Sequence, residues 1–413
     1  MRHAGAILGI AAMAVVLAAC GSSHGPVTVN WYVFPEPSGS FAAAAADCSK
    51  ASGGKYQIKI NFLSTASDQQ RVSLVRRLAA QDSALDIVAM DVDWTAEFAT
   101  AKWILPWSGA NAAAVTQGVL PGPLETATWR GKLYAAPINS NTQLLWYRKD
   151  LVPTPPKTWT QMIDDAIMLA KQGKPHYIEE QGARYEGLTV WFNSLVDSAG
   201  GGILTKDNKI IVGPSTQVAA QIMRRLADSP AADPGLNVAQ EAQSQTAWEH
   251  GGAAFQINYP YVWSGTQTDT PSIFKHMGYA PFPSITPGTT PKVSIGGYNL
   301  GVSAYSQHPE LAFEAVRCLV QSKHQVTDAI KGGLAPVLGS IYGVPSFEKA
   351  YPFHALIKAQ LEDYGIRPQT PAYADITLAI QNALSPTSNI APHTIVSTLS
   401  NEIKQALSSQ ALL

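Results

Sequence analysis

The sequence predicts a two-lobed α/β protein, each lobe a mostly parallel sheet flanked by helices. At 413 residues, the chain is longer than one ordinary hydrophobic core accommodates. Short apolar runs alternate with amphipathic stretches, which is the order that builds parallel sheets. Segments rich in Pro, Gly, Ser and Thr interrupt this order around residues 264–291 and 332–336. We therefore expect the chain to cross between two lobes through a hinge.

The first part of the chain predicts three strands separated by two helices. Val27–Phe34 and Tyr56–Leu63 have the β-branched and aromatic content of strands. Leu85–Met90 is a short apolar run, typical of a strand buried on both faces. The segment beginning near Ser40 is rich in alanine, and Asp68–Gln81 carries apolar residues at helical spacing. These two segments are the expected helices.

The remainder continues in the same manner. Leu133–Tyr147 predicts two extended runs joined by a polar kink at 139–142. Further strands are expected at 253–258 and 293–303, and helices at 159–171, 186–199, 215–227, 241–250, 310–322, 346–363, 371–384 and 394–412. From these elements we assign 27–138 and 286–335 to the N-lobe, and 139–285 and 336–413 to the C-lobe.

The N-terminus has the makeup of a secretory signal. One arginine precedes an apolar, small-residue segment that is short for a membrane span, and residues 1–19 are the expected signal peptide. The segment ends in Leu-Ala-Ala-Cys, which predicts lipidation of Cys20 and a tether over residues 20–26. The alternative is an ordinary signal peptide followed by a chance cysteine. The expected location is extracytoplasmic, anchored to the cell membrane by the lipid.

Cys48 and Cys318 remain once Cys20 carries lipid. Two remaining cysteines in an exported chain favour a disulfide. The alternative is a pair of buried free thiols.

Composition excludes several classes of function. The formal net charge is −1, from 29 basic and 30 acidic residues, and no run of Lys or Arg offers a surface for nucleic acid. The nine histidines do not fall at metal-ligand spacing, and no phosphate-binding glycine motif is present. We expect no nucleic-acid partner, no metal and no cofactor.

Two carboxylates and an indole follow the buried strand 85–90. In open α/β sheets, ligands bind outside the carboxyl ends of the strands, and Asp91, Asp93 and Trp94 lie at such an end. Carboxylates accept hydrogen bonds from sugar hydroxyls, and an aromatic face packs against the ring. Tyr259 also follows an expected strand and precedes a proline, which favours a place at the crevice.

A glycoside hydrolase is the enzymatic alternative. Asp91 and Asp93 supply two carboxylates, but they lie on one side of the crevice, whereas a hydrolase flanks its bond from two sides. Glu241, from the other lobe, could supply the second side. Binding requires only hydrogen bonds and stacking, so we expect a receptor rather than an enzyme.

Several colinear blocks extend the prediction. They are DVDWTAEFA (91–99), LPGPLETA (120–127), KLYAAPINSNTQLLWYRKDL (132–151), EGLTVWFNSLVDSAGG (186–201), INYP (257–260), IGGYNLGV (295–302), AFEAVRCL (312–319) and IRPQTPAY (366–373). Together with the lipidation motif, they resemble the solute-binding proteins of carbohydrate ABC transporters, in particular the trehalose-binding lipoproteins of mycobacterial importers.

The resemblance implies a hinge-closing, maltose-binding-protein-like fold. It implies a monomer that binds trehalose or a related disaccharide between its lobes and delivers it to the transmembrane subunits of an ABC permease. It also implies that Cys48 and Cys318 form a disulfide. The residues expected to hold the sugar are Asp91, Asn141, Glu241, Tyr259, Gly297, Tyr298 and Arg367, and Glu36 and Ser38, after the first strand, lie where this fold often contacts ligand.

Two departures from the family pattern concern the choice of sugar. Tyr259 stands where the relatives have Trp, which keeps a stacking face but shrinks it. The segment between residues 260 and 280 is also shorter than in the relatives. A receptor for another sugar or for a glycerophosphodiester therefore remains an alternative.

Overall fold

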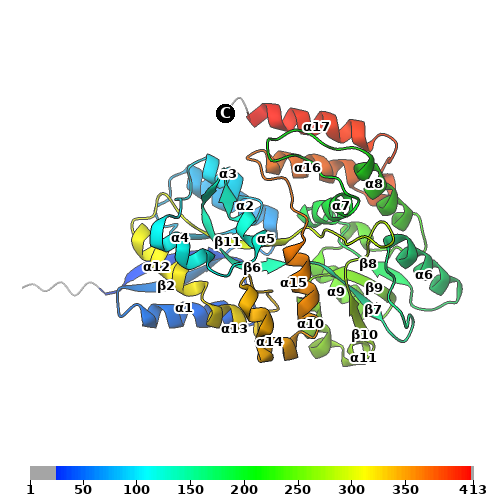
Figure 1. Ribbon diagram of the computed structural model, residues 1–413, viewed down its shortest axis with the longest axis horizontal. Coiled ribbons are helices and arrows are strands. Elements are labelled where there is room, and N and C mark those ends of the chain that lie inside the picture. The colour runs from blue at the N-terminus through cyan, green and yellow to red at the C-terminus, as the bar shows by residue number, and fades with distance from the viewer. Residues whose placement is uncertain (1–24, 411–413) are drawn as a thin grey trace, which may run out of the picture.

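Two separate sheets form the centres of two lobes, which lie side by side (Figure 1). The structure is a computed structural model that describes residues 25–410. The predicted signal peptide 1–19 and lipidation site Cys20 lie outside the described residues. None of the helices within residues 25–410 is long and apolar enough to cross a membrane.

The N-lobe contains a five-stranded sheet. Its strand order is β2 (Tyr56–Phe62), β1 (Val27–Val33), β3 (Ile87–Asp91), β11 (Gly296–Val302) and β6 (Ala135–Asn141). Strand β1 runs parallel to β2 and β3, whereas β11 runs antiparallel to β3 and β6. A short hairpin, β4 (Thr128–Trp129) and β5 (Lys132–Leu133), precedes β6.

The C-lobe contains a four-stranded sheet. Its order is β10 (Met277–Ala280), β7 (Leu144–Arg148), β9 (Ala253–Asn258) and β8 (Tyr177–Glu179). Only β8 and β9 are parallel. The predicted two-lobed α/β fold is confirmed, but the prediction of mostly parallel sheets was wrong. Strand β6 leads the chain out of the N-lobe and β11 leads it back, so these neighbours run in opposite directions.

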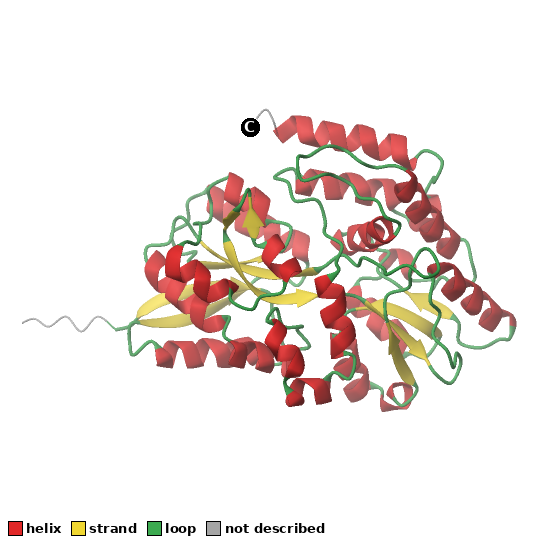
Figure 2. Cartoon of the chain, in the orientation of Figure 1, coloured by secondary structure: helices red, strands yellow, loops and turns green. Residues whose placement is uncertain are grey.

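Helices flank both sheets (Figure 2). The N-lobe has α1 (Ser40–Ala51), α2 (Ser67–Ala79), α3 (Thr95–Thr100), α4 (Gly109–Thr116), α5 (Pro121–Thr126), α12 (Pro309–Leu319) and α13 (Ser322–Gly332). The C-lobe has α6 (Trp159–Lys171), α7 (Glu186–Ser198), α8 (Pro214–Ala227), α9 (Glu241–Glu249), α10 (Tyr261–Asp269), α11 (Pro271–Phe274), α16 (Tyr373–Leu384) and α17 (Ile395–Gln410). Helices α14 (Pro345–Ala350) and α15 (His354–Glu362) lie between the lobes, and short 3-10 turns cover Leu236–Val238, Gly339–Gly343 and Thr387–Asn389.

The segment 264–291 is more regular than predicted. We expected a linker-like crossing there, but α10, α11 and β10 occupy half of it. Pro271 begins α11, where its missing N–H is not needed, and β10 pairs with β7 along its length. A residue composition typical of loops is thus overridden by sheet pairing and by a proline at a permitted position.

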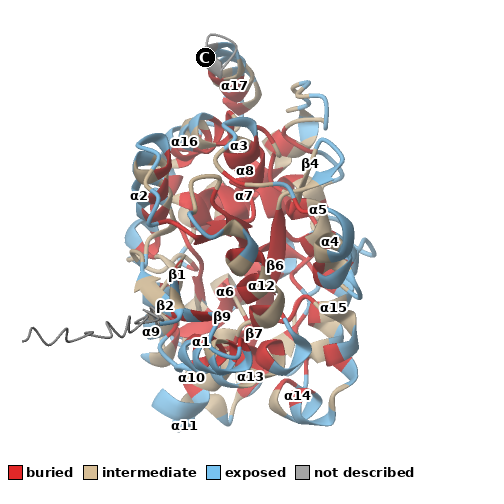
Figure 3. Cartoon of the chain, turned by 90° about the vertical axis from the view of Figure 1, so that its left-hand side faces the viewer, coloured by how far each residue is buried: buried red, intermediate tan, exposed pale blue. Residues whose placement is uncertain are grey.

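Each lobe has its own hydrophobic core. Trp31 and Phe41 are buried in the N-lobe core, and Trp159 and Trp191 in that of the C-lobe. A third cluster includes Trp146 of β7 and packs α14 and α15 against the junction. Figure 3 shows that the strands of both sheets are largely buried, and that the helices around them have exposed outer faces.

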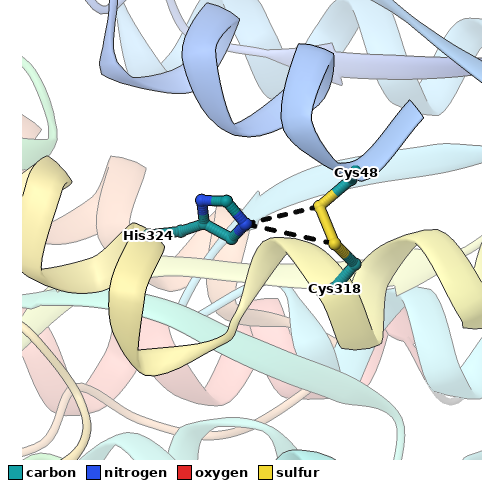
Figure 4. Close-up of side chains that lie close together, drawn as sticks. All are labelled: Cys48, Cys318 and His324. Atoms are coloured by element: carbon teal, nitrogen blue, oxygen red, sulfur yellow. Dashed lines mark hydrogen bonds between the residues drawn. A yellow bond between two sulfur atoms is a disulfide. The ribbon is translucent and has the colours of Figure 1, made fainter. Parts of the chain in front are cut away.

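The predicted disulfide is present. Cys48 of α1 and Cys318 of α12 are bonded, and His324 directs its Nε2 atom at both sulfurs, 3.5 Å from Cys48 Sγ and 4.0 Å from Cys318 Sγ (Figure 4). Within residues 25–410, these three residues are the group of metal-ligand atoms close enough to share an ion. Because the two sulfurs are bonded to each other, they are not free to act as ligands.

Three chain segments connect the lobes. Strand β6 continues through Thr142 and Gln143 into β7, and it stays in the N-lobe sheet to Asn141, past the boundary predicted at residue 138. The segment before β11 returns the chain, and Ser294 pairs there with Gly365 of the third segment. Gln360 of α15 donates hydrogen bonds to Thr142 Oγ1 (2.6 Å) and to the Gln143 carbonyl (2.8 Å).

Candidate ligand-binding site between the lobes

Strand β3 delivers two carboxylates to the boundary between the lobes. All five residues of β3 are buried, and the strand ends at Asp91. The turn that follows is closed by a hydrogen bond from the Trp94 N–H to the Asp91 carbonyl, and it places Asp93 just before α3. Both carboxylates therefore lie at the carboxyl end of a parallel strand, as predicted.

Arg367 joins these carboxylates to the C-lobe. Its Nη2 donates to Asp91 Oδ1 at 2.9 Å, and its Nη1 donates to Asp93 Oδ2 at 3.1 Å. The same Nη1 donates to Glu186 Oε1, at the start of α7, at 2.6 Å. Arg367 is only 3 % exposed. One guanidinium thus bonds carboxylates from both lobes.

Glu186 is itself held by α16. The Tyr373 hydroxyl donates to Glu186 Oε1, and Thr377 Oγ1 donates to Glu186 Oε2 at 2.7 Å. Because three donors converge on this carboxylate, Glu186 fixes where the guanidinium can lie. We call Asp91, Asp93, Glu186 and Arg367 the arginine cluster.

Burial perturbs the titration of the cluster. It raises the pKa of Asp93 well above the ordinary value; Arg367 opposes this effect, whereas Asp91 and Glu186 add to it. Burial likewise raises the pKa of Glu186 against the opposing charge of Arg367. The pKa of Arg367 lies well above its ordinary value because Asp93 and Asp91 outweigh the effect of burial, so the guanidinium stays charged.

A second group of polar residues comes from the C-lobe. Glu241 begins α9, and its carbonyl accepts a 3.0 Å hydrogen bond from Asn258 Nδ2 at the end of β9. Burial and the charge of Asp91 raise the pKa of the Glu241 carboxyl, and its interaction with Tyr185 opposes this rise. The Tyr259 N–H donates to Asn258 Oδ1 at 2.8 Å, and burial, with the charges of Glu241 and Asp91, raises the pKa of Tyr259 far above its ordinary value. The charge of Asp91 in the arginine cluster thus acts on both Glu241 and Tyr259.

Asn141 and Tyr298 come from neighbouring strands of the N-lobe sheet. Asn141 pairs with Gly296, and a methyl group at Gly296 would lie 3.6 Å from Asn141 Cβ and 4.0 Å from the Tyr259 hydroxyl. Tyr298 pairs directly with Asp91, and its hydroxyl donates to Gln70 Oε1 at 3.1 Å. The sheet therefore brings both predicted residues to the same boundary.

Gly297 has a conformational role. Its φ of 120° lies in a region that side chains avoid, and an added Cβ would approach the Asn139 carbonyl oxygen to 2.3 Å. Its own carbonyl accepts the Val92 N–H, which supports the turn that carries Asp93.

Glu36 and Ser38 lie just before α1, and Glu36 accepts hydrogen bonds from the start of this helix. Glu36 accepts hydrogen bonds from the backbone N–H groups of Ser38 (2.8 Å) and Ser40 (2.9 Å) and from Ser40 Oγ (3.0 Å). These bonds satisfy donors that a helix N-terminus leaves unpaired. The contacts described for Glu36 are with α1 and α13, not with the arginine cluster.

The sequence prediction omitted part of the site. Asp93 was recognised as a candidate carboxylate but was not included among the sugar-holding residues, and Glu186, Tyr373 and Tyr185 were not selected. Glu186 opens a predicted helix whose next turns are apolar, and a charged residue beside such a run was the available signal. Tyr373 lay inside the same block as Arg367.

A cavity of about 770 Å³ lies next to the Arg367 segment, lined by α5, the β4–β5 hairpin, the 206–208 turn, Tyr364 and Gln369. Glu125, on its wall, pairs with Lys206 at 2.8 Å and accepts a hydrogen bond from Tyr364. None of the predicted sugar-holding residues lines this cavity. The residues of the arginine cluster are buried instead.

Two lobes that meet through buried polar residues define a receptor of the hinge-closing type. The profile of the bacterial extracellular solute-binding protein family matches residues 36–326, and this chain belongs to that family. A probable ABC transporter-binding protein of Deinococcus radiodurans is 28% identical over 325 residues, which cover 76% of each chain. The diacetylchitobiose-binding protein DasA of Streptomyces coelicolor is 23% identical over 63% of this chain and 61% of its own.

Solved structures show the same fold. Maltose-bound MalE3 of T. maritima superimposes with a TM-score of 0.83 and 25% identity, covering 92% of this chain and 99% of that protein. The GacH receptor of Streptomyces glaucescens superimposes with a TM-score of 0.80 and 20% identity, covering 93% and 99%. The predicted maltose-binding-protein-like fold is confirmed.

Proposed function

We propose that this protein is the sugar receptor of an ABC importer, and that it binds trehalose or a related disaccharide between its lobes. The observation that carries the proposal is Arg367, which bonds carboxylates of both lobes inside a buried polar site. The family, and the maltose and diacetylchitobiose that two relatives bind, support a sugar. The colinear blocks support trehalose, as in the mycobacterial lipoprotein LpqY.

The chemistry of the site suits a polyhydroxyl ligand. Carboxylates, tyrosine hydroxyls and an arginine offer both acceptors and donors, and each sugar hydroxyl can use both. Binding at micromolar concentration requires roughly 8 kcal/mol, and hydrogen bonds to charged groups contribute about 1.5–3 kcal/mol each. A few such bonds, with packing of a ring against Tyr259 or Tyr298, reach that scale. Closure is favoured because only the closed form completes the bonds from both lobes.

Charge argues against the anionic alternative. Asp91, Asp93, Glu186 and Glu241 line the site, and Arg367 is the cation that bonds to three of them. A glycerophosphodiester would bring another negative charge into this buried, acid-rich environment. A neutral sugar adds none.

A hydrolase that uses Asp91 and Asp93 as its two carboxyls is also disfavoured by the geometry. Asp91 and Asp93 bond to the same guanidinium, so they do not flank a glycosidic bond from two sides. We propose that the chain carries no catalytic residue, is lipid-anchored at Cys20 and delivers its sugar to the permease as a monomer.

A ligand screen tests the proposal. Thermal unfolding of the mature protein is measured with trehalose, maltose, amino sugars and glycerophosphodiesters, since a ligand at 100 times its dissociation constant adds about 2.7 kcal/mol of stability. We expect a rise in Tm with trehalose or a related disaccharide. Asp91→Ala and Arg367→Ala should each abolish that rise, whereas Arg224→Ala, which breaks an exposed pair on α8, should not. A normal response in either site variant would reject the site.

A further inference from the structure

The arginine cluster has more carboxyl groups than one cation can balance. Asp91, Asp93 and Glu186 all bond to Arg367, and all three are at most 9 % exposed. An uncompensated buried charge is more costly than the uptake of a proton. At least one of the three carboxyls is therefore protonated at neutral pH.

Hydrogen bonding indicates which carboxyl carries the proton, because bonds from donors favour the ionised form. Glu186 accepts from three donors. Asp91 accepts from Arg367 Nη2 and from Ser67 Oγ, the latter at 3.2 Å. Among residues 25–410, Asp93 accepts only from Arg367 Nη1, which it shares with Glu186, and its buried Oδ1 atom accepts from no donor. Asp93 is the carboxyl least supported as an anion.

We propose that Asp93 is a further determinant of sugar binding, because it holds a proton at neutral pH and donates it to Asp91. Asp91 and Asp93 bond to the two terminal nitrogens of the same guanidinium, which brings the two carboxyl groups side by side. The bond keeps Asp91 ionised and oriented, ready to accept from a sugar hydroxyl, and it removes the repulsion between two adjacent carboxylates. The inference rests on the proposed function. The raised pKa of Asp93, caused first by burial, agrees with it.

Charged and titratable groups surround Asp93 on several elements. In the described part of the chain, six groups interact with it electrostatically: Asp91 of β3, Arg71 of α2, Glu186 of α7, Tyr298 of β11, Tyr373 of α16 and Arg367. Burial raises the pKa of both tyrosines, and the two arginines stay charged. We expect affinity to fall as the pH rises from 7 to 9 and Asp93 ionises. Because burial also raises the pKa of Glu186, the variants below separate these two carboxyls.

Three variants test the role of the proton. Asp93→Asn keeps a carbonyl for Arg367 and an N–H donor for Asp91, and it cannot ionise. We expect it to bind the sugar within about threefold of wild type at pH 7 and to keep that affinity at pH 9, where wild type weakens. Asp93→Leu, which removes both bonds, should weaken binding by roughly tenfold or more. Asp228→Asn, the same carboxyl-to-amide change at the exposed end of α8, is the matched control and should retain the wild-type pH profile.

Infrared spectroscopy of the sugar-free protein measures the proton directly. The wild-type minus Asp93→Asn difference spectrum at pH 7 should contain the C=O stretch of a protonated carboxylic acid. That band, together with wild-type-like affinity of Asp93→Asn, supports the proposal. Absence of the band, or an Asp93→Asn affinity as low as that of Asp93→Leu, overturns it. If no sugar binds to wild type, the proposed function fails, and the spectrum still decides where the proton resides.

Discussion

Arg367 bonds to carboxyl groups of both lobes, and the planar shape of its guanidinium allows it to reach all of them. Two terminal nitrogens reach three carboxylates, a geometry that a lysine ammonium cannot reproduce. The guanidinium is also almost fully buried, so every bond it loses leaves a carboxylate that water cannot easily solvate.

Arg367→Lys is therefore expected to behave as a loss-of-function change although it keeps the charge. We predict a fall in sugar affinity of at least about a hundredfold, since two or more charge-assisted bonds at roughly 1.5–3 kcal/mol each are lost. Titration calorimetry measures this, with Arg224→Lys as the control for the same substitution on the surface. Retained affinity in Arg367→Lys would show that only the charge is required.

Glu36 is expected to contribute to stability rather than to binding. Burial acts to raise its pKa, but hydrogen bonds from Ser38 and Ser40 outweigh this and hold the pKa below 4.5. A lowered pKa gives stability that is present above the unfolded value and lost as the pH falls through the folded value. Glu36→Gln should lower the free energy of unfolding by about 1 kcal/mol at pH 7 and flatten its acid dependence below about pH 4.5.

Urea unfolding at several pH values measures that change, and calorimetry at pH 7 should give unchanged sugar affinity. A large loss of affinity in Glu36→Gln would instead assign Glu36 to the sugar, as the sequence suggested.

At the scale of elements, the disulfide fastens α1 to α12 across 270 residues of sequence. Closing so long a loop removes much of the freedom of the unfolded chain. Replacing both cysteines by Ser should therefore reduce the free energy of unfolding by about 2–5 kcal/mol while leaving sugar affinity unchanged, because both cysteines lie in the N-lobe, away from the arginine cluster. Denaturant unfolding should give the same free energy of unfolding for the variant and for the reduced wild type. A variant as stable as oxidised wild type would contradict the prediction.

Replacing Gly297 tests whether strand β11 supports the turn that carries Asp93. Gly297→Ala should destabilise the protein by more than about 1 kcal/mol, because Ala is strained at a positive φ and its Cβ would clash with the Asn139 carbonyl. The same change should weaken sugar binding, since the Gly297 carbonyl holds the turn that carries Asp93. Thermal unfolding and calorimetry measure the two effects, and Gly343→Ala, with nothing near its added Cβ, is the control.

For the whole molecule, the buried cluster implies that the lobes are held together by ion pairs across their boundary. Arg367 leads into α16 of the C-lobe, whereas Asp91 and Asp93 belong to the N-lobe. Removing one side of this contact should shift the sugar-free protein toward an open form.

Small-angle X-ray scattering measures that shift. We predict a larger radius of gyration for sugar-free Arg367→Ala than for sugar-free wild type, and a decrease for wild type when trehalose is added. Arg224→Ala should scatter like wild type. Identical scattering of Arg367→Ala and wild type would mean that other contacts hold the lobes together.

The sequence by itself determined the local elements, the two-lobed fold and several partners of the site. The apolar run before Asp91 is typical of a buried strand, and strand ends of an α/β sheet gather polar residues, so Asp91 was accessible to prediction from the pattern alone. Asn141, Tyr298 and Arg367 were predicted through the resemblance to the carbohydrate-binding family. Three features are visible only in the tertiary structure. Strand β11 pairs antiparallel with its neighbours, Glu186 accepts a hydrogen bond from Arg367, and Glu36 accepts hydrogen bonds at the start of α1. These depend on which segments from distant parts of the chain pack together, and neither the spacing nor the type of a single residue contains that information.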